Sequence, residues 1–164
     1  MDLSGYLLED LLTNAIKSEI EAKELYENLS EKVKNFLLKE KLKFLAQEEQ
    51  RHRETFESIF NKRFPGKKIT LPEKSTVPLP NIVITSEKVK ISEVFEIAMK
   101  AEKLAYDFYI ALAPHFKDEP EVEQMIHYIA SMEMGHYKIF EIERENALKF
   151  EDYDVENPLL HLGP

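Results

Sequence analysis

The side chains of this sequence that are best suited to bind metal ions belong to two glutamate–histidine pairs and two single glutamates. Each pair has the spacing Glu-x-x-His, and a single glutamate precedes it by 30 or 31 residues. Residues three apart on a helix project from one face, so the carboxylate and the imidazole of a pair can serve one ion. The six residues are Glu19, Glu49, His52, Glu102, Glu133 and His136. They provide a ligand set for two metal ions inside a helical bundle.

These residues recur because the chain contains one helical pair twice. Residues 15–19 align with residues 98–102 at a shift of 83, and residues 44–52 align with residues 128–136 at a shift of 84. An isolated Glu-x-x-His motif is a weak signal in so acidic a chain. Chance does not readily place both pairs and both single glutamates in register within a repeat.

Metal binding also explains how so many acids can share one core. Four carboxylates buried without cations would repel one another and lose hydration worth about several kcal/mol apiece. Two divalent ions would balance their charge. A carboxylate-rich set with one nitrogen per metal suits iron or manganese, whereas zinc more often shows thiolate or more histidine. We therefore expect two iron ions, with manganese or zinc as alternatives.

The elements that must position these residues are helices, because the hydrophobic periodicity is helical almost throughout. The expected helices cover residues 5–29, 30–60, 92–116 and 120–150. Ser30 and Ser92 are the expected caps of the second and third helices. Pro114 bends or ends the third helix, and a capping box with proline in its first turn, residues 118–121, starts the fourth.

The core stripe of each helix, taken at alternating steps of three and four, meets a ligand at its middle. In every helix the interruption therefore falls at one layer of the bundle. The small residues Ala15, Ala22, Ala98 and Ala105 flank the single glutamates and leave room near them.

A connection over about residues 64–91 breaks the helical pattern with several prolines, and within it residues 82–84 and 89–91 could form short extended pieces. Two antiparallel hairpins joined by one long crossover have such a connection. We expect an all-α four-helix bundle over residues 1–150 and a loosely held tail over residues 151–164.

Composition excludes several classes of protein. The net charge of −9 argues against nucleic-acid binding and against docking on anionic lipid. The chain has no cysteine, which excludes disulfides, Cys-ligated zinc and iron–sulfur centres within it. It has no transmembrane run and no signal peptide, so we expect a cytoplasmic protein.

The motifs resemble the ferritin-like di-iron carboxylate superfamily and, within it, the rubrerythrin-like branch without a rubredoxin domain. The resemblance covers residues 6–148. Tyr26 and Tyr109, seven residues after the single glutamates, resemble tyrosines that support the metal site in rubrerythrins; simple core packing is the alternative. Met99 and Ala105 occupy both positions where rubrerythrins usually carry a further glutamate beside the third-helix ligand.

The resemblance implies an oxidoreductase that reduces hydrogen peroxide or dioxygen. Because the chain has no cysteine-ligated rubredoxin module, its electrons would come from a separate donor protein. Two alternatives remain open: a ferroxidase or iron-storage protein, and a bundle with a structural metal site that binds a partner. We expect a homodimer.

Overall fold

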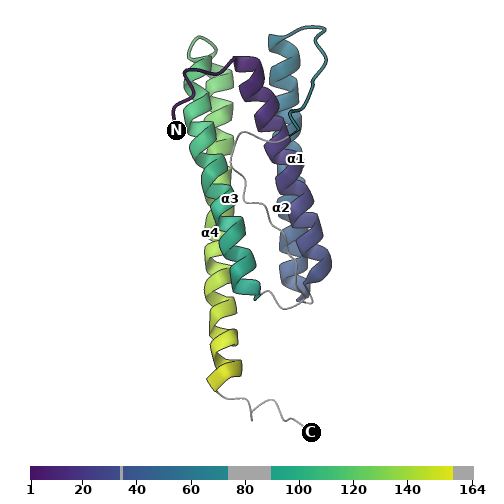
Figure 1. Ribbon diagram of the computed structural model, residues 1–164, viewed down its shortest axis with the longest axis vertical. Helices are drawn as coiled ribbons and strands as arrows, with labels where there is room; N and C mark the ends of the chain where they lie inside the picture. Colours follow the sequence, from purple (N-terminus) through teal and green to yellow (C-terminus); the bar gives the residue numbers. More distant parts are fainter. Residues whose placement is uncertain (34, 74–89, 157–164) are drawn as a thin grey trace.

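A computed structural model describes the chain over residues 1–33, 35–73 and 90–156. Four long helices run beside one another in two antiparallel hairpins, with a short 3₁₀ helix between the last two (Figure 1). The elements are α1 (Leu8–Lys32), α2 (Phe36–Arg63), α3 (Ile91–Leu112), η1 (Ala113–Phe116) and α4 (Pro120–Glu156). The described residues contain no strand, so the all-α prediction is confirmed.

Both predicted serine caps are wrong. Ser30 lies inside α1, where its hydroxyl donates to the Glu27 carbonyl at 2.7 Å, and α1 continues to Lys32. The cap of α2 is Asn35, whose side chain accepts from the Leu38 N–H at 3.1 Å. Ser92 lies in the first turn of α3, after Lys90 at the cap position.

A proline explains where the third helix ends. α3 stops at Leu112, and the η1 turn carries Pro114, which has no N–H to continue an α-helical ladder. The N–H of Glu119 then donates to the Phe116 carbonyl at 2.7 Å, and α4 begins at Pro120, as predicted. The fourth helix extends to Glu156, beyond the expected end near residue 150, and projects past the other helices (Figure 1).

The crossover is described only at its two ends. It leaves α2 through a turn in which Gly66 has φ +78°, a left-handed conformation that glycine adopts without strain. The possible extended piece at residues 82–84 lies outside the described residues. Of residues 89–91, Lys90 is described as the cap of α3 and Ile91 as its first helical residue, so Ile91 is not extended.

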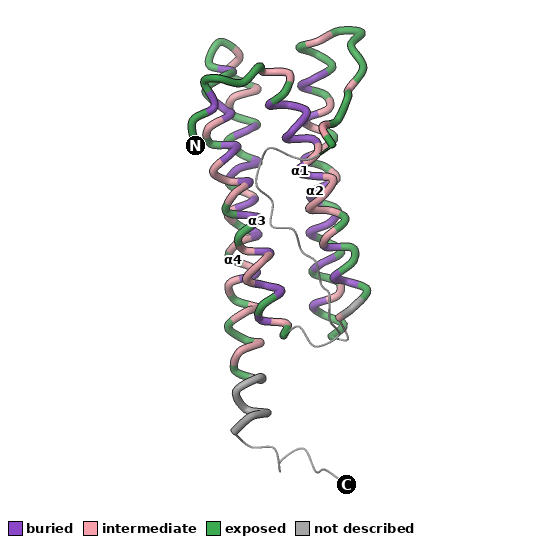
Figure 2. Tube along the Cα trace, in the orientation of Figure 1, coloured by how far each residue is buried: buried purple, intermediate pink, exposed green. Residues whose placement is uncertain are grey.

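Two hydrophobic clusters fill the bundle, one toward each end, and the buried faces of all four helices turn inward (Figure 2). Ile16, Phe56 and Tyr109 belong to the first cluster. Tyr26 and Phe140 belong to the second. The predicted ligands lie between the clusters, so each end of the polar layer is closed by packed apolar side chains. None of the described helices has the length and apolar character needed to cross a bilayer.

Candidate metal centre

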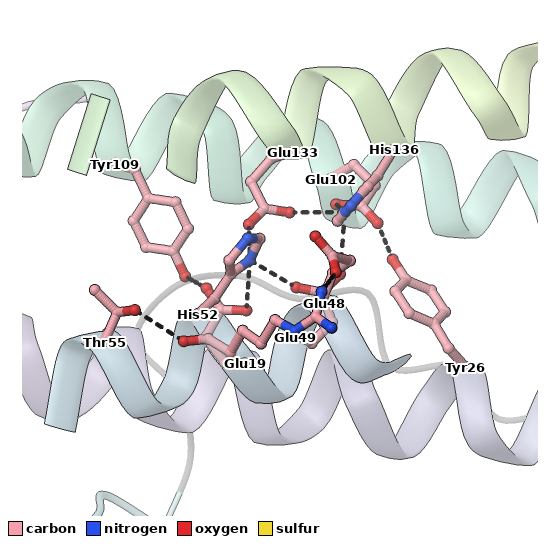
Figure 3. A network of polar contacts seen from close by, with 11 residues as sticks. Glu19, Tyr26, Glu48, Glu49, His52, Thr55, Glu102, Tyr109, Glu133 and His136 are labelled. Atoms are coloured by element: carbon pink, nitrogen blue, oxygen red, sulfur yellow. Dashed lines mark hydrogen bonds and ion pairs between the residues drawn. The ribbon is translucent and has the colours of Figure 1, made fainter. Parts of the chain in front are cut away.

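The structure brings all six predicted ligands together in the middle of the bundle (Figure 3). α1 and α3 each contribute one glutamate, and α2 and α4 each contribute a Glu-x-x-His pair. No member of the set is more than 4% exposed. Helical spacing explains this placement, since each side chain occupies a core position that an apolar residue fills one turn away.

One half of the cluster surrounds His52. Its Nδ1 lies 2.9 Å from Glu133 Oε1, 3.1 Å from Glu49 Oε2 and 3.7 Å from Glu19 Oε2. These four residues each offer a ligand atom within 4.8 Å of the others. Three carboxylates and one imidazole thus converge on one position.

The other half surrounds His136 in the same way. Its Nδ1 lies 3.1 Å from Glu49 Oε1, 3.5 Å from Glu133 Oε2 and 3.7 Å from Glu102 Oε2. The two imidazole rings are stacked, with centroids 5.9 Å apart. The second position therefore repeats the first across the axis that relates the two hairpins.

Glu49 and Glu133 belong to both halves. Each turns one carboxylate oxygen toward His52 and the other toward His136. Glu19 contacts only the His52 side, and Glu102 only the His136 side. A carboxylate with two such oxygens can bridge a pair of ions, and a carboxylate on one side can complete a single ion's ligand set.

The chemistry of the donor atoms fits cations. Glu49 Oε1 and His136 Nδ1 in one half of the cluster, and Glu133 Oε1 in the other, are buried without a hydrogen-bond partner. Buried polar atoms are normally satisfied, so unpartnered carboxylate and imidazole atoms in both halves of the cluster indicate a missing partner of positive charge.

The electrostatics point the same way. Burial raises the pKa of Glu19 and that of Glu102 well above their usual range, and repulsion from Glu133 adds to this. Burial by itself lowers the pKa of His52 and of His136, but the carboxylates that lie close around each imidazole outweigh it and raise both pKa values. The metal-free cluster therefore keeps protons that the same side chains would release in water. Groups that hold protons in this way favour the binding of positive charge.

Two tyrosines tie the hairpins together beside the cluster. The Tyr26 hydroxyl of α1 donates to Glu102 of α3, and the Tyr109 hydroxyl of α3 donates to Glu19 of α1. Both tyrosines are fully buried, and burial raises the pKa of each, with the nearby glutamates adding to the shift. Each single glutamate is thus oriented by a tyrosine from the opposite hairpin (Figure 3).

Sequence reasoning missed Glu48, which is buried directly beside the ligand Glu49. Its carboxylate pairs with Arg51, one turn further along α2, and it belongs to neither group of candidate ligands. The spacing Glu-x-x-Arg is the sequence feature that could have predicted this ion pair, because residues three apart on a helix share a face.

The two positions at which the sequence departs from the rubrerythrin pattern lie among apolar side chains. Met99 packs against the second hydrophobic cluster and Ala105 lies within the first. The remaining described histidines, His115 and His127, are exposed and stand apart from the cluster.

Two antiparallel helical hairpins that enclose a buried carboxylate–histidine cluster define a ferritin-like bundle. The model of the Rubrerythrin family matches residues 10–143, so the chain belongs to the rubrerythrin family within the ferritin-like di-iron superfamily. A hypothetical protein from Pyrococcus furiosus has a similar structure, with a TM-score of 0.82 and 39% identity over 90% of this chain and 94% of that chain. No curated protein matches the chain significantly.

Proposed function

We propose that this chain is a non-haem di-iron protein that reduces hydrogen peroxide or dioxygen with electrons from a separate donor protein. The observation that carries the proposal is the pair of ligand groups that share Glu49 and Glu133. Two metal positions joined by common carboxylates suit chemistry that moves two electrons at once. The oxygen-rich donor set, with one imidazole for each position, favours iron.

When bound, two ferrous ions would supply the two electrons that convert one peroxide and two protons into two waters, and the donor protein would return those electrons. The chain's own residues set the conditions for this reaction. Glu19 and His52 hold one position, while Glu102 and His136 hold the other. The hydrophobic clusters on both sides exclude bulk water, which strengthens every charge interaction at the site.

The tyrosines position two of the carboxylates during this chemistry. Tyr26 keeps its proton on the hydroxyl oxygen and donates it in a hydrogen bond to Glu102, and Tyr109 does the same for Glu19. Because their pKa values are raised, both hydroxyls stay protonated over the working pH range. Each bond leaves the second oxygen of its glutamate directed at the cluster.

The test begins with the metal content of protein purified without chelator, followed by electronic spectra of ferrous-loaded protein before and after peroxide. We expect two irons per chain and rapid oxidation by peroxide. Glu49→Gln should abolish peroxide consumption because it removes a carboxylate common to both positions. Glu48→Gln is the matched control, since this neighbouring buried glutamate lies outside both ligand groups.

Peroxide turnover that survives in Glu49→Gln would contradict the proposal, as would a metal-loaded protein whose spectrum peroxide leaves unchanged. Uptake of many irons per chain in a large hollow assembly would identify a ferroxidase or storage protein instead. Gel filtration combined with iron analysis distinguishes this outcome from a peroxidase with two irons per chain.

A further inference from the structure

Two buried phenylalanines pack against the two tyrosines of the metal layer. The Phe56 ring lies 4.9 Å from the Tyr109 ring, centroid to centroid, and the Phe140 ring lies 5.3 Å from the Tyr26 ring. Both pairs are tilted and fall within the range of about 4.5–7 Å at which aromatic rings attract each other. All four side chains are among the largest that the bundle buries completely. The tyrosines are thus held by ring packing as well as by their hydroxyl groups.

Each phenylalanine comes from the same hairpin as the glutamate that the tyrosine contacts. Phe56 on α2 and Glu19 on α1 both belong to the first hairpin, and Tyr109 of the second hairpin contacts both. Tyr26 does the same in the opposite direction, with a glutamate and Phe140 of the second hairpin. Each tyrosine therefore enters the opposite hairpin, where a carboxylate accepts from its hydroxyl and a phenylalanine packs on its ring (Figure 3 shows the two tyrosines).

The phenylalanines also follow the histidine ligands along their helices. Phe56 comes four residues after His52 on α2, and the second half repeats this spacing on α4. Residues four apart share a helix face, so each phenylalanine packs on the same side of its helix as a candidate ligand. Phe56 contacts Tyr109, whose hydroxyl donates to Glu19. Glu19 in turn lies 3.7 Å from His52 Nδ1, so these contacts form a closed loop around one half of the cluster.

The repeat provides an internal comparison for these phenylalanines. Besides the ligands, the core stripe of α2 contains Leu38, Leu42, Leu45, Phe56 and Ile59, and at the shift of 84 the counterparts in α4 are Val122, Ile126, Ile129, Phe140 and Glu143. Four of these five positions differ in residue type, and only the phenylalanine recurs, as the ligands do. Cores accept exchanges among apolar residues of similar volume. The recurrence therefore indicates a requirement for an aromatic ring against the tyrosine, beyond the need to fill the core.

We propose that Phe56 and Phe140 are positioning residues for the two metal positions and that they act through Tyr109 and Tyr26. The inference rests on the metal centre of the proposed function, but not on its reaction with peroxide. The hydroxyl of a tyrosine lies at the far end of its ring, so a tilt of the ring moves the hydroxyl away from its glutamate. The phenylalanine ring prevents that tilt. Its removal leaves space in which the tyrosine can turn, and the glutamate then loses the hydrogen bond that orients it.

Phe56→Leu tests the proposal, and Phe60→Leu is its matched control. Phe60 is fully buried in the same hydrophobic cluster, one turn further along α2, and its ring packs against Phe64 instead of a tyrosine. Both variants remove a buried ring and should lower the Tm of the metal-free protein by similar amounts. Phe56→Leu should also weaken Fe²⁺ binding by about 10–100-fold, measured without oxygen by competition with a chelator, whereas Phe60→Leu should not. Equal Fe²⁺ affinities in the two variants would overturn the proposal.

A double-mutant cycle distinguishes an effect through the tyrosine from a general loosening of the core. In the Tyr109→Phe background the hydrogen bond to Glu19 is already absent. If Phe56 acts through that hydroxyl, Phe56→Leu should cause no further loss of Fe²⁺ affinity in this background. Additive losses would contradict the proposal, because they would show that Phe56 affects the centre independently of the Tyr109 hydroxyl.

The two halves should respond separately, and NMR signals of the His52 and His136 rings report on each during titration with Zn²⁺, a diamagnetic probe. Phe56→Leu should delay saturation of the His52 signals more than that of the His136 signals, and Phe140→Leu should do the reverse. An equal delay at both histidines would refute the assignment of each phenylalanine to one metal position. These measurements use no peroxide, so a protein that binds metal as expected but does not react with peroxide would refute the proposed function and leave this inference standing.

Discussion

At the scale of single residues, Glu49 and Glu133 make the centre one unit. Each has one oxygen within 3.5 Å of His52 and the other within 3.5 Å of His136, so a change at one of them alters both halves of the cluster. Glu19 and Glu102 each contact only one histidine. Substitutions at the shared carboxylates should therefore remove both ions, whereas substitutions at the unshared ones should affect one ion more than the other.

Metal binding should release protons and become tighter as pH rises. The pKa values of Glu19, Glu102, His52 and His136 are all raised in the metal-free protein, so these groups carry protons that a metal ion must displace. Calorimetric titration in two buffers with different ionisation enthalpies measures the number released. Binding without proton release, or with constant affinity from pH 6 to pH 8, would contradict the protonated metal-free cluster.

The tyrosine hydroxyls should strengthen metal binding without serving as ligands. Tyr26→Phe and Tyr109→Phe remove the hydrogen bonds to Glu102 and Glu19. Loss of such supporting contacts typically weakens metal affinity by about 10–100-fold. Competition with a chelator measures this change, and Tyr106→Phe, a half-buried tyrosine of α3 outside the cluster, should bind as the wild type does.

The six candidate ligands could be predicted from sequence because the repeat places them in register and each falls on a core stripe. Other features of the site depend on three-dimensional packing. The crossed tyrosine–glutamate bonds join residues 76 and 90 positions apart, and no local pattern specifies such a pairing. Glu48 escaped prediction because an acid beside a ligand usually faces solvent, whereas here Arg51 compensates its burial.

At the scale of elements, the boundary between α1 and α2 shows why caps are hard to predict. Ser30 and Asn35 are both good capping residues, and they lie five residues apart. Helix α1 continues past Ser30 because that hydroxyl is satisfied by a carbonyl of its own helix. The helices themselves were predictable, since their apolar periodicity extends over many turns.

Asn35→Ala should destabilise the protein by about 1 kcal/mol, because it leaves the Leu38 N–H without its side-chain acceptor. Ser30→Ala should have a smaller effect, since alanine favours the helix interior that Ser30 occupies. Urea unfolding of metal-free protein followed by circular dichroism compares the two. A larger loss of stability in Ser30→Ala than in Asn35→Ala would show that Ser30, and not Asn35, caps α2.

At the scale of the whole molecule, the two hairpins meet through the hydrophobic clusters and the ligand layer between them. Bound metal ions would link all four helices and stabilise the folded bundle. The metal-free protein must instead keep its buried carboxylates and imidazoles satisfied with protons.

The stability of metal-free protein should therefore fall as pH rises from about 6 to 9. His52 and His136 have raised pKa values in the fold, so their stabilising effect is complete below about 6.5, the unfolded pKa, and is lost as pH rises toward the folded pKa. Each of these histidines lowers the free energy of unfolding by up to about 1.4 kcal/mol for every unit by which the pH rises in this range. Glu19 and Glu102, whose pKa values are also raised, act in the same direction.

Thermal unfolding at several pH values, with and without iron, measures this dependence. The metal-loaded protein should show the opposite trend, because its imidazoles are neutral and binding strengthens as protons leave. Glu133 has a lowered pKa, so its contribution is lost only below about 4.5, outside this range. If the stabilities of the metal-free and metal-loaded proteins changed with pH in the same direction, this prediction would be wrong.

The crossed tyrosine bonds have a consequence for how such a protein can arise. Neither hairpin alone carries a complete site, yet each carries the ligand pair, the single glutamate and the tyrosine that the other requires. Two identical hairpins joined by exact twofold symmetry would supply the same set of groups. Once fused in one chain, the halves are free to diverge wherever symmetry is not needed. Glu48 and Arg51 in one half correspond to Met132 and Gly135 in the other, so the halves differ directly beside ligands that are identical in both.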